Sequence, residues 1–238
     1  MRSSHACLLV APLLTVAHSF GVEIVALQAT YRTTVLYEGQ TQDVGDRTVT
    51  VRAAEIDGVP AWRVVSQLTV EGTATADTVE FRRTDLRPLG RRAKFGQAEL
   101  TLIVDADVAR GLLVVSRQLQ PLNVPLGKAS FLNYYALRTA IAAWPLERSW
   151  KTDASMLELK AEPQFVSLTL AVVGEERVSV PAGAYDCWVV TVAGVSGPLK
   201  IGERYWVAKD DRIVVRTDER FGDRGAHLQL ELTQLRRF

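Results

Sequence analysis

The stretch Val180–Val190 reads VPAGAYDCWVV, a Pro-Ala-Gly turn that leads directly into an apolar segment. Successive side chains of a strand point to opposite faces, so Tyr185, Cys187 and Val189 share one face. Trp188 and the valines at every second position after it share the other face. Both faces are apolar, which predicts a strand that is covered on both sides, by the interior of a β-barrel and by a helix.

Other segments alternate between apolar and polar residues, as half-buried strands do. Two of them flank Asp57-Gly58-Val59-Pro60, which predicts a hairpin with its turn at Asp-Gly. Short strands at near-regular spacing favour an antiparallel meander that closes toward a barrel or half-barrel. The expected strands cover 48–57, 61–70, 77–83, 98–105, 111–116, 168–172, 203–208, 212–218 and 228–233, with further turns at Gly174–Glu176 and Lys209–Asp210.

Residues 130–144, SFLNYYALRTAIAAW, break this pattern. The segment lacks Gly and Pro, Ser130 can cap its start, and Pro145 ends it. We therefore predict a mainly β protein: an antiparallel half-barrel or barrel with one central helix at about 130–144. One stripe of that helix carries Phe131, Tyr134, Tyr135, Arg138 and Ile141.

The N-terminus resembles an export signal. Arg2 precedes the apolar run Ala6–Ala17, which is too short to span a bilayer, and Ala17-His18-Ser19 offers small residues where signal peptidase cuts. We predict a signal peptide at 1–19, with cleavage as late as residue 29, and a single β-rich domain at 30–238 in the periplasm or secreted. A buried N-terminal helix or an uncleaved anchor is the alternative.

Cleavage after Ser19 removes one basic residue and no acid, which leaves 27 basic and 27 acidic residues. A neutral chain without a basic block is poorly suited to nucleic acid. Cys187 and His227 then remain as the one cysteine and the one histidine. Cys187 has no disulfide partner, and we expect it to be a small buried side chain.

Catalytic patterns are incomplete. A Ser-His-Asp triad requires an imidazole, and we expect His227 to be solvated at a strand end. A proline replaces the last glycine of a nucleophile elbow at 194–198, and an alanine replaces Ser or Thr of a phosphate loop at 127–130. The adjacent acids Glu175-Glu176 and Asp210-Asp211 point opposite ways along an extended chain. We expect no enzyme, no metal site and no cofactor.

Three motifs together resemble an exported bacterial family called domain of unknown function 3108. They are VPAGAYDCWVV, the segment 203–216 (ERYWVAKDDRIVVR) and the segment 131–138 (FLNYYALR). The resemblance covers about residues 30–238. It implies a fold similar in style to the envelope lipoprotein carriers, which hold acyl chains in an open β half-barrel under helices. The family has no established catalytic residues to transfer.

Aromatic residues concentrate between 134 and 206, where they either fill a core or line a cavity between helix and sheet. Arg138 on the helix stripe either snorkels, pairs with a protein carboxylate, or meets an acidic group of a ligand. If a cavity exists, the helix stripe faces Trp188 or Trp206 across it. The candidate ligand-binding residues are Phe131, Tyr134, Tyr135, Arg138, Trp188 and Trp206.

Two functions fit these features. One is a binder or carrier of a lipid-like or other apolar small molecule, and the alternative is a non-catalytic envelope interaction or assembly scaffold with a filled core. The expected partners are thus an apolar ligand or an envelope protein, with no nucleic acid and no transmembrane segment in the mature chain.

The mature protein is expected to begin at Phe20, with Thr30 as the second choice. The apolar run that ends at Ala17-His18-Ser19 is the reason. N-terminal sequencing of protein recovered from the periplasm checks this, and recovery from the cytoplasm with Met1 intact would contradict it.

Overall fold

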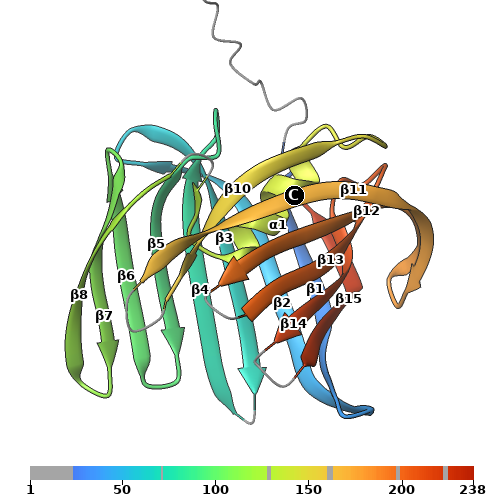
Figure 1. Ribbon diagram of the computed structural model, residues 1–238, viewed down its shortest axis with the longest axis horizontal. Helices are drawn as coiled ribbons and strands as arrows, with labels where there is room; N and C mark the ends of the chain where they lie inside the picture. The colour runs from blue at the N-terminus through green and yellow to red at the C-terminus, as the bar shows by residue number, and fades with distance from the viewer. Residues whose placement is uncertain (1–23, 71, 128–129, 160–162, 197–198, 222–224) are drawn as a thin grey trace, which may run out of the picture.

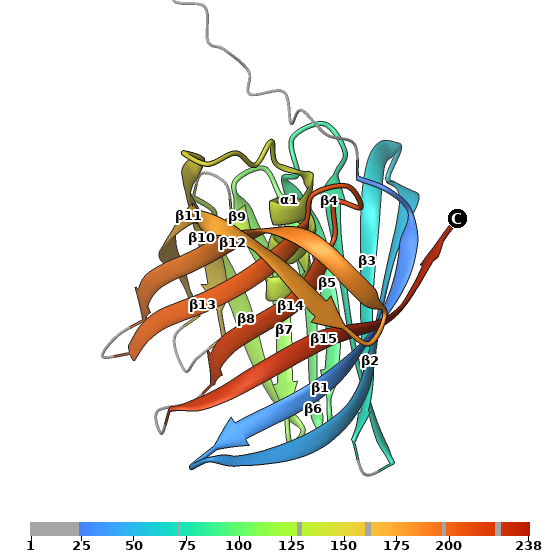
Figure 2. The same cartoon turned by 90° about the vertical axis from the view of Figure 1, so that its right-hand side faces the viewer.

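The structure is a computed structural model that describes residues 24–238 except 71, 128–129, 160–162, 197–198 and 222–224. The predicted signal peptide lies outside these ranges. The described residues form a sheet of fifteen strands that curves around a single helix, α1 (Tyr134–Ala143), as Figures 1 and 2 show. The predicted fold class is therefore confirmed. Within these ranges no helix has the length and apolar character needed to cross a membrane.

The sheet is built outward in both directions from its first strand. β1 lies between β2 and β15, and the order runs from β8 back to β1 on one side and from β15 back to β9 on the other. Neighbours are antiparallel except β9 and β10. The strands are β1 (Leu27–Tyr37), β2 (Gln40–Ile56), β3 (Val59–Val70), β4 (Thr73–Arg82), β5 (Pro88–Phe95), β6 (Ala98–Asp105), β7 (Val108–Val115), β8 (Gln118–Pro125), β9 (Ser130–Phe131), β10 (Lys151–Glu158), β11 (Gln164–Val180), β12 (Gly183–Ser196), β13 (Leu199–Ala208), β14 (Val214–Phe221) and β15 (Ala226–Arg237).

The sheet is a half-barrel and not a closed barrel. Its edges are β8 and β9, which follow each other in the chain, and no ladder joins them in the described residues. Both edges are poor templates for further pairing. Pro121 and Pro125 in β8 lack the N–H that an added strand would need, and β9 has only two residues.

Of three predicted turns, one is present as predicted and two differ in the structure. Asp57 and Gly58 have φ values of 50° and 78°, as a two-residue type I′ hairpin requires, so the predicted turn is confirmed. Gly174–Glu176 is not a turn, because β11 continues through it with an irregularity between Val172 and Gly174. The loop predicted at Lys209–Asp210 extends to Ile213 before β14 begins.

The hairpin of β11 and β12, which contains the stretch Val180–Val190, is longer than its sequence suggests. β11 and β12 run beyond the end of β13, where the ladder of β12 with β13 starts at Cys187. The irregularity at Val173 lets the hairpin bend, and its tip reaches the last strand, where the Ala182 N–H donates to the Leu232 carbonyl at 3.0 Å. This hydrogen bond joins the tip of the β11–β12 hairpin to β15.

The helix is shorter than predicted and starts later. Ser130 is not its cap, because Ser130 and Phe131 pair with β10 as strand β9. Asn133 is the cap, and its side chain accepts the Ala136 N–H at 2.9 Å. The predicted stop before Pro145 is confirmed, since Trp144 is extended.

The core lies between the concave face of the sheet and α1. The helix is buried nearly all round and packs against β3, β4, β9 and β14 (Figure 2). Leu137, Ala140 and Ile141 are fully buried. The sheet contributes alternate residues of each strand to the same core, such as Val64 and Val79.

A buried ion pair connects this core to the chain just before the helix. Arg91 on β5 donates to both oxygens of Asp77 on β4, at 3.0 and 2.7 Å, and both side chains are about nine-tenths buried. The same guanidinium donates to the Leu132 carbonyl at 2.6 Å. The pair therefore fixes the entry to α1 against the N-terminal half of the sheet.

Replacing Asp77 with Ala is expected to lower the free energy of unfolding by about 3–5 kcal/mol, because Arg91 is left buried without its counter-charge. Glu80→Ala on the same strand is the control. It breaks the pair with Arg63, which is half-exposed, and should cost about 1 kcal/mol or less. Urea unfolding measures both, and equal losses would contradict the importance assigned to the buried pair.

Candidate functional site

The inner face of the C-terminal half carries an unusual concentration of buried charge. Arg138 of α1 forms an ion pair with Glu219 of β14, and both side chains are nearly buried. Glu203 of β13 lies directly opposite Glu219 in the ladder and is also buried. Its carboxyl group accepts a hydrogen bond from Tyr205. One guanidinium and two carboxyl groups therefore share one apolar enclosure.

The electrostatics of this cluster favour a protonated Glu203. Burial, followed by the neighbouring Glu219 carboxylate, raises the pKa of Glu203 to about 8 from its ordinary 4.5. The Arg138–Glu219 ion pair and a neutral Glu203 together carry no net charge. A neutral cluster is the arrangement that a low-dielectric interior tolerates best.

A second arginine meets α1 from the other half of the sheet. Arg47 of β2 donates to the Tyr135 hydroxyl and to Ser66 Oγ, the latter at 3.2 Å. Its guanidinium carbon lies 5.4 Å from the centre of the Tyr135 ring, within range of a cation–π contact. Arg138 approaches the same ring at 5.1 Å. Tyr135 is thus held between two guanidinium groups.

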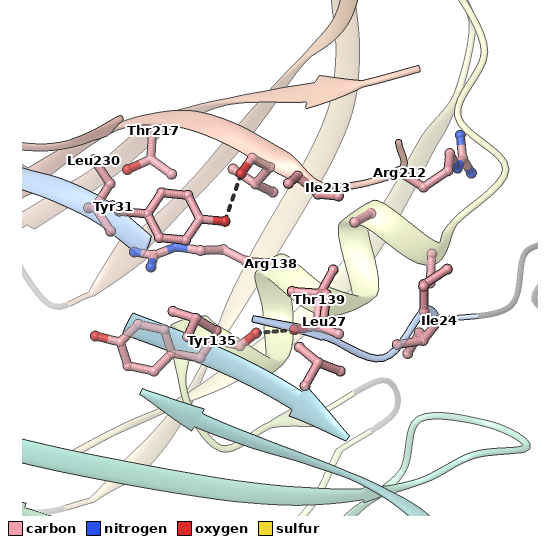
Figure 3. Close-up of a pocket in the computed structure, with 16 residues that line it drawn as sticks. Ile24, Leu27, Tyr31, Tyr135, Arg138, Thr139, Arg212, Ile213, Thr217 and Leu230 are labelled. Carbon is pink, nitrogen blue, oxygen red and sulfur yellow. Dashed lines mark hydrogen bonds between the residues drawn. The ribbon is translucent and has the colours of Figure 1, made fainter. Parts of the chain in front are cut away.

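A pocket opens beside this polar cluster, between α1 and strands from both halves of the sheet (Figure 3). Its cavity volume is about 60 Å³, below the roughly 300–1,000 Å³ of most small-molecule sites, so the pocket is narrow. Its walls are mainly aliphatic and comprise Leu27, Val49, Val51, Ala142, Ala143, Ile213, Val214 and Leu230.

Polar groups stand at the two ends of the pocket. At the deep end Tyr31 donates to the Val214 carbonyl at 2.9 Å, and burial raises the pKa of its phenol, which stays neutral. Arg138 Nε and Thr217 Oγ1 are buried there without a hydrogen-bond partner in the described residues. At the other end lie the half-buried Arg212 and the exposed Val25, so that end is the mouth.

The structure brings some of the predicted site residues to the pocket and places the others elsewhere. Tyr135 and Arg138 line the pocket, and Arg138 pairs with a protein carboxylate, one of the alternatives that the sequence left open. Tyr134 lies near Glu203, and burial, with the neighbouring Glu203, raises the pKa of its phenol. Phe131 lies in β9, not on the helix, and packs edge-on against Trp144 with ring centres 6.0 Å apart.

Neither Trp188 nor Trp206 lines this pocket. The Trp206 indole N–H donates to Glu176 at 2.8 Å, and Arg216 lies over its ring at 4.9 Å. Lys209 lies 4.3 Å from the centre of the Trp188 ring. The structure thus does not place either tryptophan across the pocket from the helix. Ligand binding by the six predicted residues stays a prediction.

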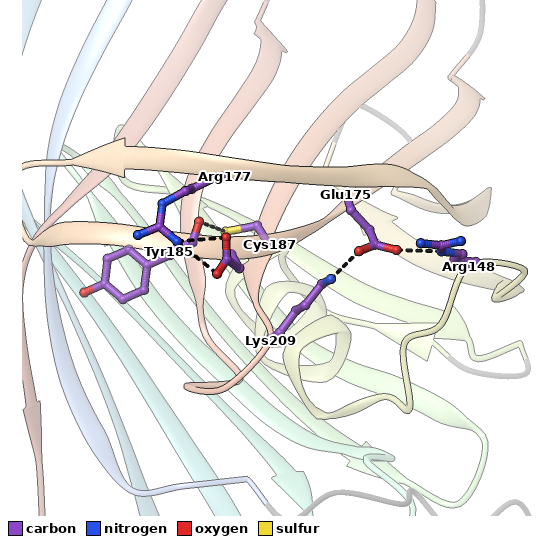
Figure 4. Close-up of polar contacts among 7 residues, drawn as sticks. Arg148, Glu175, Arg177, Tyr185, Cys187 and Lys209 are labelled. Atoms are coloured by element: carbon purple, nitrogen blue, oxygen red, sulfur yellow. Dashed lines mark hydrogen bonds and ion pairs between the residues drawn. The ribbon is translucent and has the colours of Figure 1, made fainter.

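Cys187 is buried and unpaired, as expected from the opening stretch (Figure 4). Burial, with the nearby Asp186 and Glu176 carboxylates, raises the pKa of its thiol to about 12. Nucleophilic cysteines need the thiolate and partial exposure, so this thiol is unsuited to catalysis. Glu175, which lies opposite Trp188 on the adjacent strand, forms ion pairs with Lys209 and Arg148 on the surface.

His227 is half-exposed, as predicted for a strand end, but it is not simply solvated. Its Nδ1 lies 2.7 Å from Asp218 Oδ1 on the adjacent strand. A histidine and a carboxylate are two members of a catalytic triad, but His227 has no hydroxyl partner among the described residues. The pair therefore serves as a cross-strand contact.

Glu203, Glu219 and Arg47 were not predicted as site residues from the sequence. A signal for them exists, because each stands at an inward position of its strand. Glu203 lies two residues before the buried Tyr205, and Glu219 lies two residues after the buried Thr217, so each shares a face with that buried residue. A charged residue on a core-facing row predicts a buried partner. No comparable signal marks Arg212, which lies in a loop.

The comparisons with known proteins bear on this geometry. The sequence pattern of DUF3108, described as a protein of unknown function, matches residues 29–229. The chain belongs to this family. No curated protein matches it. The family assignment confirms the resemblance drawn from the three motifs and brings no established activity.

Several solved structures are similar over nearly the whole chain. A β-barrel-like protein of domain of unknown function DUF1849 from Brucella abortus superposes with a TM-score of 0.53 at 13% identity, covering 92% of this chain and 100% of that one. A putative exported protein with a YmcC-like fold from Bacteroides fragilis gives 0.39 at 13% identity, covering 92% and 99%. The hypothetical lipoprotein YmcC from Escherichia coli gives 0.38 at 9% identity, covering 91% and 89%. The first similarity supports the barrel-like fold.

Glu203 is expected to make stability depend on pH. Between its ordinary pKa of 4.5 and its folded pKa of about 8, the unfolded chain releases a proton that the folded protein keeps. The free energy of unfolding should therefore fall as pH rises through this interval, by about 1 kcal/mol per pH unit. Glu203→Gln should remove this component of the slope.

The control is Glu231→Gln, which alters a half-buried pair with Arg216 on the next strands. Its slope between pH 5 and 8 should match that of the original protein. Denaturant unfolding at several pH values provides the measurement. An unchanged slope in Glu203→Gln would show that Glu203 ionises normally in the folded protein.

Proposed function

We propose that this protein is an exported, non-catalytic binder of a lipid-like or apolar small molecule, held in the pocket between α1 and the sheet. The pocket carries the proposal. It is a narrow, largely aliphatic space between the central helix and the sheet. Concave, mostly apolar sites with a few polar groups are the usual form of small-molecule sites.

The residues around the pocket support a binding role over a filled core. Two of the helix residues that face it, Ala142 and Ala143, are small, and the sheet strands opposite contribute Leu27 and Val51. Larger side chains at the alanines would close the space at no cost to the helix, since Leu is also a good helix former. The void is thus kept open by the choice of residues.

Export is supported by where the folded part begins. β1 starts at Leu27, and Leu27 and Ala29 are buried in ladders with both β2 and β15. A cut after Ser19 leaves this strand whole, whereas a cut after Ala29 removes its buried start. Similar structures described as an exported protein and as a lipoprotein are in keeping with this proposal.

Ala142→Leu is expected to fill the pocket and abolish binding of a fluorescent fatty acid to delipidated protein, with little loss of stability. Ala76→Leu is the matched control, because Ala76 lies on β4 on the face opposite the buried Asp77. Saturable fluorescence titration measures both. The filled-scaffold alternative predicts no saturable binding to the original protein, and overpacking in Ala142→Leu that costs about 1–3 kcal/mol.

A further inference from the structure

The mouth of the pocket contains an arginine that has no counter-charge among the described residues. Arg212 is half-buried, its Nη2 donates to the Trp144 carbonyl, and its Nε is buried without a partner in the described residues. The nearest acid in sequence, Asp211, is paired with Arg237. Burial alone shifts the pKa of Arg212, downward, with no contribution from a carboxylate. This guanidinium therefore has unused capacity to pair with an anion.

The other arginine of the pocket already has a counter-charge. Arg138 pairs with Glu219, and Glu203 stands next to the pair. An anion at this deep end would share one guanidinium with the Glu219 carboxylate, and the two like charges would repel each other in a buried site. An anionic group entering the pocket is thus favoured at the mouth and disfavoured at the deep end.

Between these ends the walls are aliphatic. Figure 3 shows Arg212 and Ile24 at one end of the pocket and Tyr31 with the Arg138 guanidinium at the other. The Ile213 and Val214 side chains continue inward directly from Arg212 on the same chain segment. A molecule with a charged head and an apolar tail matches this sequence of surfaces.

We infer that the ligand class of this pocket is a single-chain amphiphile with an anionic head group, with the head at Arg212 and the tail between α1 and strands β1, β2 and β15. The inference rests on the proposed function. It adds the charge of the ligand and its orientation in the pocket. The head chemistry is shared by fatty acids and by phosphate-bearing lipids.

Three ten-carbon probes test this: decanoate, decyl phosphate and decanol. By isothermal titration calorimetry on the delipidated full mature chain, the two anionic probes should bind at least about tenfold more tightly than decanol. Arg212→Gln should remove that preference and leave decanol binding unchanged. Arg212→Lys, which keeps the charge, should retain most of it. Whichever anionic probe binds more tightly distinguishes a fatty acid from a phosphate-bearing source.

Arg92→Gln is the control, since Arg92 is exposed on β5 and its loss changes the net charge by the same amount. It should leave all three affinities unchanged. Thermal unfolding of Arg212→Gln within a few degrees of the original shows that the fold is intact. Equal binding of the three probes, or a preference that survives Arg212→Gln, would overturn this inference alone. Failure of every probe to bind would overturn the proposed function itself.

Discussion

The fold depends on arginines that hold a helix inside a sheet that does not close. Arg91 reaches the Leu132 carbonyl at the entry to α1, and Arg47 reaches Tyr135 on its first turn. Arg138 extends from the helix itself to Glu219. A buried guanidinium that loses its partner costs several kcal/mol, so each contact fixes the helix in one place. In a closed barrel, pairing between the two edge strands would hold the sheet around the helix. Here these arginine contacts take that role.

The same contacts join the two halves of the sheet. Arg47 and Arg91 belong to strands on one side of β1, and Glu219 belongs to a strand on the other side. The halves share a continuous ladder at β1 and β15, and α1 packs against strands of both, with β3 and β4 on one side and β14 on the other. A curved sheet with free edges could flatten or twist further, and α1 sets its curvature by bonding to both arms.

The sequence predicted the fold well where a local pattern decides the outcome. The Asp57-Gly58 turn and the two buried faces of the strand around Cys187 follow from turn chemistry and from the period of two. The helix start could not be predicted in the same way. Phe131 reads as helical in sequence, yet the parallel ladder with Met156, 25 residues further on, takes it into the sheet. Long-range pairing outweighs local propensity here.

The site was predictable only in part, for a related reason. Tyr135 and Arg138 could be selected because one helical stripe carries them, but their partners come from β2 and β14. Trp188 and Trp206 were selected as aromatics, and aromatic content does not tell which face of a twisted strand a ring takes. Arg212 gives no signal in sequence, because the role proposed for it rests on its having no carboxylate partner among the described residues.

The pocket exists only in the assembled protein. Its walls come from the first strand, the helix and the loop before β14, which lie more than 60 residues apart from one another in the chain. No partly folded unit contains all of them, so a ligand of this pocket binds the native state and not the unfolded chain. Such a ligand stabilises the whole fold by mass action. The void left by Ala142 and Ala143 lowers packing in the free protein, and an occupant that fills it restores the dispersion contacts that the small side chains forgo.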